Sequence, residues 1–119
     1  MTIAGIDHVQ VAAPAGCEAE ARAFYAGVLG LEELPKPEAL RARGGCWFRA
    51  GAQELHVGVE EPFAPARKAH PGFVVEDLEG LANRLRDAGT DVAYDDTIPG
   101  AKRFYAADPF GNRLEFRQA

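Results

Sequence analysis

The sequence predicts an α+β domain built from two copies of a βαβββ unit, and three observations support this prediction. Strand-like and helix-like segments follow the same order in each half of the chain. Each half opens with a histidine at the head of a short apolar strand, His8 and His70, about half of the 119 residues apart. Each half also contains an amphipathic helix that ends at a glycine. Self-similarity of this kind indicates a duplicated unit, so we expect copies at residues 1–60 and 70–119 within a single domain, residues 1–119.

Length and composition exclude several classes of protein. A chain of 119 residues is long enough for one compact core. The formal net charge of -5 offers no basic surface to nucleic acid or to an anionic membrane, and no apolar run approaches the ~20 residues that span a bilayer. The first residues resemble no signal peptide, so we expect a cytoplasmic protein. Cys17 and Cys46 form no CxxC motif, and we expect both to be reduced and buried.

In the first half, residues 6–13 alternate as a strand does, with His8 and Gln10 on one face. Residues 17–29 carry one apolar helical stripe, and Gly30 follows as a left-handed cap. Residues 31–34 are short and extended, and residues 37–45 form a loop or a short helical piece. Residues 46–49 and 53–60 form a hairpin in which Glu54, His56 and Gly58 share a face. Residues 61–69 contain two prolines and link the halves.

The second half repeats this order. Residues 70–76 are the expected strand, Asp77 is the expected N-cap, and residues 78–88 are the expected helix. Residues 91–94 and 102–106 are further strands, a turn at residues 108–112 follows, and residues 113–117 return. In this alignment Glu115 occupies the position that His56 occupies in the first half. We expect the two sheets to curl toward each other as one mixed sheet around a cleft, because neither is large enough to bury both of its faces.

The repeat places four metal-binding side chains at matched positions: His8, His56, His70 and Glu115. These include all three histidines, and all three fall on predicted strands. Three imidazoles and one carboxylate suit a divalent cation of intermediate softness, and octahedral geometry would leave two positions for water or substrate. A histidine on a strand is also often an ordinary polar residue, and no HxH or HExxH motif is present.

Other residues are candidates for substrate binding. Each half has a strand with two adjacent aromatic residues, and alternation sends one of each pair into the core. Trp47 and Tyr105 are the candidates for substrate contact, with packing as the alternative. Arg43 and Arg103 each lie just before such a strand, and a guanidinium suits a carboxylate or a phosphate, with an ordinary solvated charge as the favoured alternative for each. Asp108 and Asn112 are better explained by turn formation.

Five motifs carry a resemblance to a known family: IDHVQV, AFYAGVLGLE, ELHVGV, AHPGFVVEDLE and ADPFGNRLEF. They resemble the vicinal oxygen chelate superfamily, which includes glyoxalase I, methylmalonyl-CoA epimerase, fosfomycin-resistance thiol transferases, extradiol dioxygenases and bleomycin-resistance proteins. The resemblance covers essentially the whole chain. It implies the glyoxalase-like fold, a homodimer, a small-molecule substrate and a divalent metal ion (Zn, Ni, Fe or Mn) held by the same four residues.

The resemblance leaves the reaction open. Glyoxalase I usually has a glutamate, and the epimerase a glutamine, where this chain has His56. Without His56, the remaining His8, His70 and Glu115 match the fosfomycin-type and extradiol arrangements equally well. We expect a lyase or isomerase in preference to a dioxygenase or thiol transferase, with Glu115 as the group that doubles as a base. The alternative is a metal-free protein that binds an antibiotic, as bleomycin-resistance proteins do.

Overall fold

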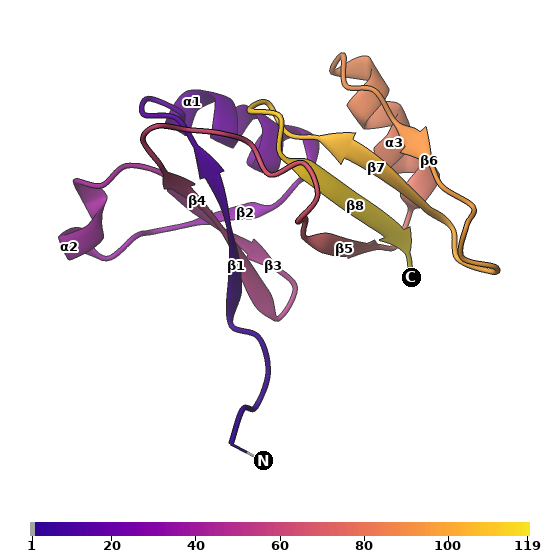
Figure 1. Ribbon diagram of the computed structural model, residues 1–119, viewed down its shortest axis with the longest axis horizontal. Helices are drawn as coiled ribbons and strands as arrows, with labels where there is room; N and C mark the ends of the chain where they lie inside the picture. Colours follow the sequence, from indigo (N-terminus) through magenta and orange to yellow (C-terminus); the bar gives the residue numbers. More distant parts are fainter. Residues whose placement is uncertain (1) are drawn as a thin grey trace. The chain divides into compact units, whose positions relative to one another are not determined.

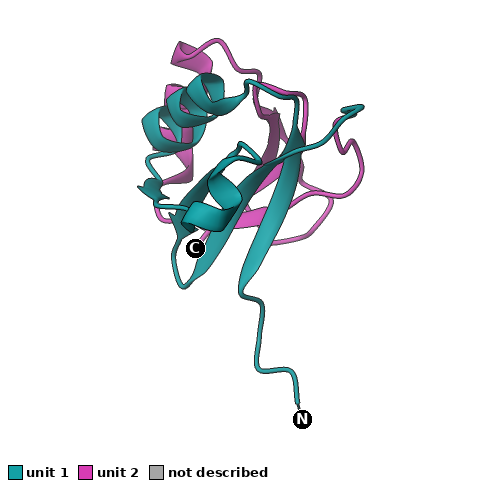
Figure 2. Cartoon of the chain, turned by 90° about the vertical axis from the view of Figure 1, so that its left-hand side faces the viewer, with its two compact units in different colours: residues 1–64 teal, residues 65–119 magenta. Residues whose placement is uncertain are grey.

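The computed structural model describes residues 2–119. The chain divides into two compact units, residues 1–64 (unit 1) and residues 65–119 (unit 2), as Figure 2 shows. Each unit contains one four-stranded sheet; the helical elements α1, η1 and α2 belong to unit 1 and α3 belongs to unit 2 (Figure 1). The two predicted copies of the repeat, residues 1–60 and 70–119, fall one in each unit.

Unit 1 has strands in the order β1-β4-β3-β2. β1 runs parallel to β4, and the other neighbours are antiparallel. Its elements, in chain order, are β1 (His8–Ala13), α1 (Glu18–Ala21), η1 (Arg22–Val28), β2 (Glu32–Leu34), α2 (Glu38–Arg41), β3 (Cys46–Ala50) and β4 (Gln53–Val59).

Unit 2 repeats this topology with the order β5-β8-β7-β6. β5 runs parallel to β8, and the other neighbours are antiparallel. Its elements are β5 (Gly72–Val75), α3 (Leu78–Asp87), β6 (Ala93–Tyr94), β7 (Arg103–Ala107) and β8 (Arg113–Gln118). These sheets confirm the α+β class and the order of elements predicted for both halves.

Strand register is the same in the two units. In unit 1, His56 lies opposite Gln10 of β1 and Trp47 of β3. In unit 2, Glu115 lies opposite Gly72 of β5 and Tyr105 of β7. The match of His56 with Glu115 is therefore a property of the strand pairing as well as of the sequence.

One face of each sheet packs against its helix and forms the core. In unit 1, η1 packs on β2 and β3, and Tyr25 and Phe48 are fully buried with ring centroids 5.5 Å apart. In unit 2, α3 packs on β8, and Phe104 and Phe116 are buried with centroids 5.3 Å apart. Burial of such an aromatic side chain contributes roughly 1.5–3 kcal/mol. Alternation turns the neighbours Trp47 and Tyr105 to the other face, which we call the polar face of each sheet.

The first helix is not a regular α-helix as the apolar stripe predicted. It begins as α1 and continues as the π-helix η1, in which Leu29 N–H donates to Phe24 O at 2.9 Å, five residues earlier. The stripe residues Ala21, Phe24 and Tyr25 are nevertheless buried. An apolar stripe with a period of 3.6 residues does not distinguish an α-helix from a short π-helix.

The strand predicted at residues 70–76 begins only at Gly72. His70 therefore precedes β5, and the prediction that all three histidines lie on strands was wrong for this one. The physical reason is Pro71, which has no N–H to continue the ladder, although its carbonyl still accepts from Glu115 N–H at 3.1 Å.

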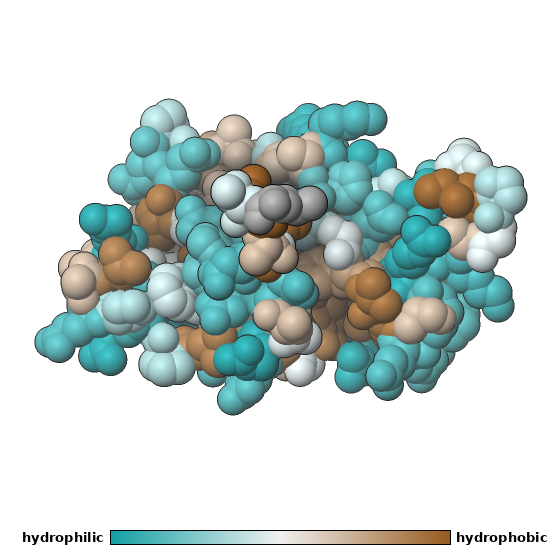
Figure 3. All heavy atoms as spheres, turned by 90° about the horizontal axis from the view of Figure 1, so that it is seen from below, coloured by the Kyte–Doolittle hydropathy of each residue, from teal (hydrophilic) through white to brown (hydrophobic). Residues whose placement is uncertain are grey.

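The surface in Figure 3 is mostly hydrophilic, with small separate hydrophobic areas. Large apolar residues that are exposed include Ile3, Ile6, Val74 and Ile98. Across residues 2–119 no helix has the length and apolar character needed to cross a bilayer.

Candidate functional site

The polar face of unit 1 carries a stack of three rings, which with Glu54 we call the unit 1 cluster. The His56 ring lies between Trp47 and His8: its centroid is 4.0 Å from that of Trp47 and 4.2 Å from that of His8, with interplanar angles of 5° and 15°. This stack arises because Trp47 is the cross-strand partner of His56, while β1 lies on the other side of β4. His8 and His56, two of the four predicted metal ligands, are thus in direct contact.

The two imidazoles of this cluster differ in surroundings. The His56 side chain is 6% exposed, and its Nε2 lies 2.9 Å from Glu54 Oε1. The His8 side chain is 45% exposed, and its Nδ1 lies 3.0 Å from Asp7 Oδ2. Glu54 lies two residues from His56, so strand alternation places both on the same face. The pattern that indicated His56 as a site residue therefore also indicated Glu54. We had not predicted Glu54 as a partner of the site.

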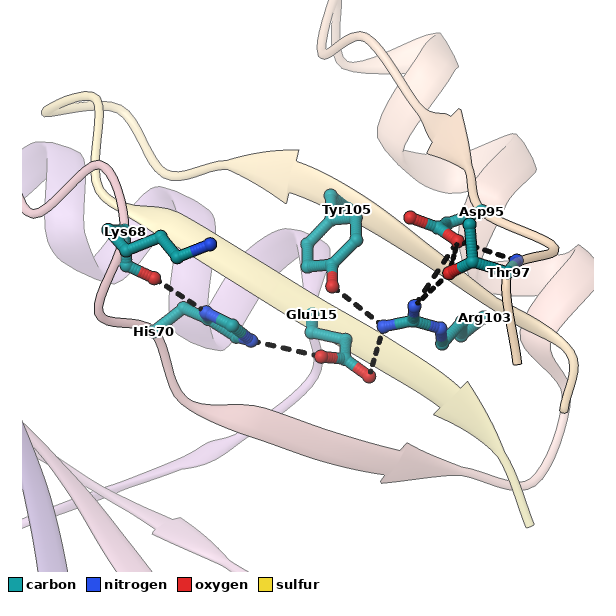
Figure 4. Close-up of polar contacts among 7 residues, drawn as sticks. All are labelled: Lys68, His70, Asp95, Thr97, Arg103, Tyr105 and Glu115. Atoms are coloured by element: carbon teal, nitrogen blue, oxygen red, sulfur yellow. Dashed lines mark hydrogen bonds and ion pairs between the residues drawn. The ribbon is translucent and has the colours of Figure 1, made fainter.

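The polar face of unit 2 carries a charged network, shown in Figure 4, which we call the unit 2 cluster. Its centre is the pair His70 and Glu115, in which His70 Nε2 lies 2.9 Å from Glu115 Oε1. The network continues through Arg103 to three further side chains: Tyr105, Asp95 and Thr97. It therefore joins the loop before β5, the loop after β6 and strands β7 and β8.

His70 is held so that one ring nitrogen is available. Its Nδ1 lies 2.9 Å from the carbonyl oxygen of Lys68, and a carbonyl only accepts, so Nδ1 carries the proton of this hydrogen bond. The Nε2 atom then faces Glu115. A proton shared between Nε2 and a carboxylate oxygen occupies the place that a divalent cation can take, because both atoms are metal ligands when they are deprotonated.

Glu115 is kept ionised by its neighbours. Its partial burial opposes ionisation, but the hydrogen bonds from His70 and Arg103 outweigh this effect and lower the pKa of the carboxyl. A carboxylate that stays charged is suited to bind a cation, whereas a protonated one is not. The chemistry of this pair therefore fits a divalent metal ion.

The other predicted residues lie in different settings. Arg103 is 7% exposed, and its guanidinium faces protein oxygen atoms. Tyr105 meets the edge of the His70 ring at 5.5 Å, and the Arg113 guanidinium lies 4.0 Å above the Tyr105 ring. Arg43 is exposed in the turn that follows α2 and forms no part of either cluster. Sequence reasoning missed Asp95, Thr97 and Arg113, of which only Arg113 had a signal, the alternation with Glu115.

The turn at residues 108–112 is structural, as predicted. Asp108 Oδ1 accepts from the N–H groups of Phe110 and Asn112 at 2.9 Å, and Asn112 Nδ2 donates to Asp108 Oδ2 at 2.9 Å. Asn112 Oδ1 also accepts from Ala66 N–H at 3.0 Å, which ties the segment before His70 to the turn.

Within each unit the predicted ligands come as a pair: His8 with His56, and His70 with Glu115. Among residues 2–119, no three or more His, Cys, Asp or Glu side chains are grouped so that they could hold a metal ion.

The whole chain is similar to proteins of known structure. The sequence profile of the Glyoxalase/Bleomycin resistance protein/Dioxygenase superfamily matches residues 5–116. A glyoxalase family protein from Bacillus anthracis is 55% identical in sequence, with a TM-score of 0.96 over 99% of this chain and 97% of that chain.

More distant structures share the fold. They include a lactoylglutathione lyase from Agrobacterium tumefaciens, with 23% identity and a TM-score of 0.76 over 100% of this chain and 96% of that chain. The fosfomycin resistance protein FosX from Listeria monocytogenes has 13% identity and a TM-score of 0.78 over 99% of this chain and 95% of that chain. No protein with a curated functional description matches the chain.

Proposed function

Because the chain belongs to the Glyoxalase/Bleomycin resistance protein/Dioxygenase superfamily, we propose that it is a small cytoplasmic enzyme that depends on a divalent metal ion and acts as a lyase or isomerase. Superfamily members commonly use divalent metals and bind small-molecule substrates. The substrate would offer two adjacent oxygen atoms, as a 2-oxoaldehyde adduct does. The two cysteines, both free and buried, agree with a reducing compartment.

The observation that carries this proposal is the matched position of the two donor pairs. His56 and Glu115 lie at the same register position of two sheets with one topology, opposite Gln10 and Gly72. His8 and His70 each lie two residues before that partner and contact His56 and Glu115 respectively. We propose that these four side chains are ligands of a divalent metal ion, as the resemblance to the superfamily implies. Three imidazoles and one carboxylate give the site a net charge of about +1 with a divalent ion, which favours a bound anion.

The chain's own groups suggest how the reaction would proceed. The metal ion would supply a Lewis acid that stabilises negative charge on a substrate oxygen. Glu115 is the ionised carboxylate of the unit 2 cluster and, on release from the metal ion, would accept the proton that the substrate loses. Trp47 lies on the polar face beside His56 and would contact the substrate's apolar part. We further propose a homodimer, as superfamily members are often dimeric.

Metal analysis tests the proposal. We expect untagged protein to contain about one equivalent of a transition metal for each site. Substitution of His8, His70 or Glu115 (H8A, H70A, E115Q) should lower the metal content at least tenfold, because each removes a ligand. Glu60→Gln, which changes an exposed carboxylate at the end of the β4 hairpin, is the matched control and should leave it unchanged. Metal content that stays at the wild-type level in all three variants would contradict the proposal.

A second candidate function is the capture of a small aromatic molecule without metal. The observation in its favour is the unit 1 stack, in which His56 Nε2 is already paired with Glu54 and the Trp47 ring lies flat against His56. Aromatic faces of this kind bind planar ligands. Metal-free wild-type protein whose Trp47 fluorescence is quenched by a planar antibiotic would support this function. Turnover of a 2-oxoaldehyde adduct that a chelator abolishes would support the enzyme.

A further inference from the structure

The contacts of Arg103 differ most from the role that the sequence predicted for it. The sequence offered it as a grip for an anionic substrate. In the structure its side chain is only 8% exposed, and both terminal nitrogens face protein oxygen atoms. Nη1 lies 2.6 Å from Tyr105 Oη and 3.3 Å from Glu115 Oε2. Nη2 lies 3.1 Å from Thr97 Oγ1 and 3.2 Å from Asp95 Oδ1.

These contacts use all of the donors that could reach a ligand. Each terminal nitrogen of a guanidinium carries two hydrogens, and each has two oxygen neighbours here. The fifth donor, Nε–H, is buried and has no partner among residues 2–119. A substrate anion would therefore have to displace an existing partner of Arg103, at the cost of leaving that partner unpaired.

The contacts instead divide the two oxygens of Glu115 between two neighbours. Oε2 faces Arg103, and Oε1 faces His70 (Figure 4). The terminal torsion of a glutamate is broad and nearly two-fold, so an unsupported carboxylate would present either oxygen or both. With one oxygen held at Arg103, a single oxygen of Glu115 is presented to His70.

Arg103 is itself fixed from the opposite side. Asp95 Oδ1 accepts from Thr97 N–H at 2.9 Å and from the Thr97 hydroxyl at 2.6 Å, so the loop after β6 forms a closed turn. These hydrogen bonds, followed by the positive charge of Arg103, lower the pKa of Asp95. The guanidinium thus lies between two carboxylates, and its planar fork is held at several points.

We propose that Arg103 is a positioning residue: it holds Oε2 of Glu115 so that Oε1 alone, beside Nε2 of His70, is presented to the divalent cation. This inference rests on the proposed function, because Glu115 is a metal ligand only there. It assigns Arg103 no contact with substrate. It also makes the Asp95–Thr97 turn part of the support of the site.

The test compares three substitutions by calorimetric titration with Zn²⁺. Arg103→Met removes every donor and should weaken Zn²⁺ binding about 10–100-fold, the range found when a partner of a metal ligand is removed. Arg103→Lys keeps one charge without the fork and should recover part of the loss. Arg113→Met is the matched control. The Arg113 guanidinium also lies over the Tyr105 ring, 4.0 Å from its centroid, and its loss should change the affinity less than about twofold, because no ligand partner is removed.

A second readout uses protein without metal. The ring nitrogens of His70 give ¹⁵N resonances that report its contact with Glu115. In Arg103→Met these resonances should shift, while those of His8 and His56 in unit 1 should stay in place. Asp95→Asn loosens Arg103 without touching Glu115, so it should give an intermediate shift if Arg103→Met folds poorly. In the Glu115→Gln background, Arg103→Met should have no further effect on Zn²⁺ affinity.

The outcomes separate the two proposals. Wild-type affinity and unchanged His70 resonances in Arg103→Met would overturn the positioning role, as would equal losses in Arg103→Met and Arg113→Met. A lower melting temperature with unchanged affinity for each folded molecule would show a structural role only and would also overturn it. If the wild type binds no metal, the proposed function fails, and the His70 resonances still decide whether Arg103 orients Glu115.

Discussion

Gly45 and Glu18 show how single residues set the geometry before β3. Gly45 has a φ of +86°, and a Cβ there would lie 2.1 Å from the carbonyl oxygen of Val57, so no other residue fits. Its N–H donates to Glu18 Oε2 at 2.6 Å. This hydrogen bond is the main reason that the pKa of Glu18 is lowered. Glu18 therefore joins the first helix to the start of the strand that carries Trp47.

We predict that Glu18→Gln lowers the free energy of unfolding at pH 7 by about 1 kcal/mol, because it removes the charge from this hydrogen bond. A carboxyl with a lowered pKa in the folded state stabilises the fold above its unfolded pKa, about 4.3, and loses this effect as the pH falls through the folded value. The difference between wild type and variant should therefore shrink between pH 5 and pH 3. Urea denaturation across this range measures it.

A difference that stays constant with pH would show that the charge of Glu18 contributes nothing. Glu20→Gln is the matched control. It lies in the same helix turn, is exposed, and should change the stability by less than about 0.5 kcal/mol at any pH.

The sequence predicted which residues lie on the polar faces, but it did not predict which side chains they contact. Alternation correctly sent Phe48 and Phe104 to the core and Trp47 and Tyr105 to the other face. Arg103 was a candidate substrate ligand because of its place at the start of an aromatic strand. Whether the Arg103 guanidinium is free for a ligand depends on Asp95 and Thr97, which lie eight and six residues earlier in the chain. No sequence pattern indicates that this turn contacts Arg103.

At the scale of elements, α3 is the segment that the sequence described best. The predicted N-cap Asp77 accepts from Gly80 N–H at 3.0 Å, and the helix runs Leu78–Asp87 with its stripe buried. A Cβ at Gly80 would come within 2.3 Å of the Asp77 carboxylate, so the glycine makes room for the cap. Local signals sufficed here because cap, stripe and terminating glycine all agree.

We predict that Asp77→Ala lowers the free energy of unfolding by about 1 kcal/mol, since the N-cap hydrogen bond and the favourable charge at the helix N-terminus are both lost. Thermal or urea denaturation measures the change. The control, Asp87→Asn, removes a negative charge at the C-terminal end of the same helix. It should be neutral or stabilising by roughly 0.3 kcal/mol. Equal destabilisation by both substitutions would contradict this account of the cap.

Other elements departed from their prediction for local physical reasons. The wider turns of η1 still bury the stripe residues Phe24 and Tyr25, so the stripe could not reveal a π-helix. The strand β5 starts late because of Pro71, and the missing N–H left His70 in a loop. Such shifts move an element's boundary while its side chains keep their neighbours, as the contact of His70 with Glu115 shows.

For the whole molecule, the internal repeat was the most informative signal. It predicted two sheets with one topology, and the structure gives β1-β4-β3-β2 and β5-β8-β7-β6. It also matched His8 with His70 and His56 with Glu115, and within each unit the two residues so placed are in contact. The sequence left open whether one chain or two copies supply the four proposed ligands.

A mixing experiment decides between these arrangements. His8→Ala and Glu115→Gln each damage one pair, in unit 1 and in unit 2. If two copies share each site, exchange of subunits regenerates about a quarter of the metal sites in the mixture. If one chain supplies all four ligands, none are regenerated. A mixture of His8→Ala with His56→Ala is the control, because both changes lie in unit 1 and no arrangement restores an intact site.

The shared strand register has a consequence for how this protein can change over evolutionary time. The two sheets have the same register positions but different residues at them. Trp47, His56 and Gln10 in unit 1 correspond to Tyr105, Glu115 and Gly72 in unit 2. The two units thus differ in the chemistry of their polar faces while both keep the same hydrogen-bonded ladder. New ligand preferences can therefore arise by point substitution at these register positions without any change in the core residues.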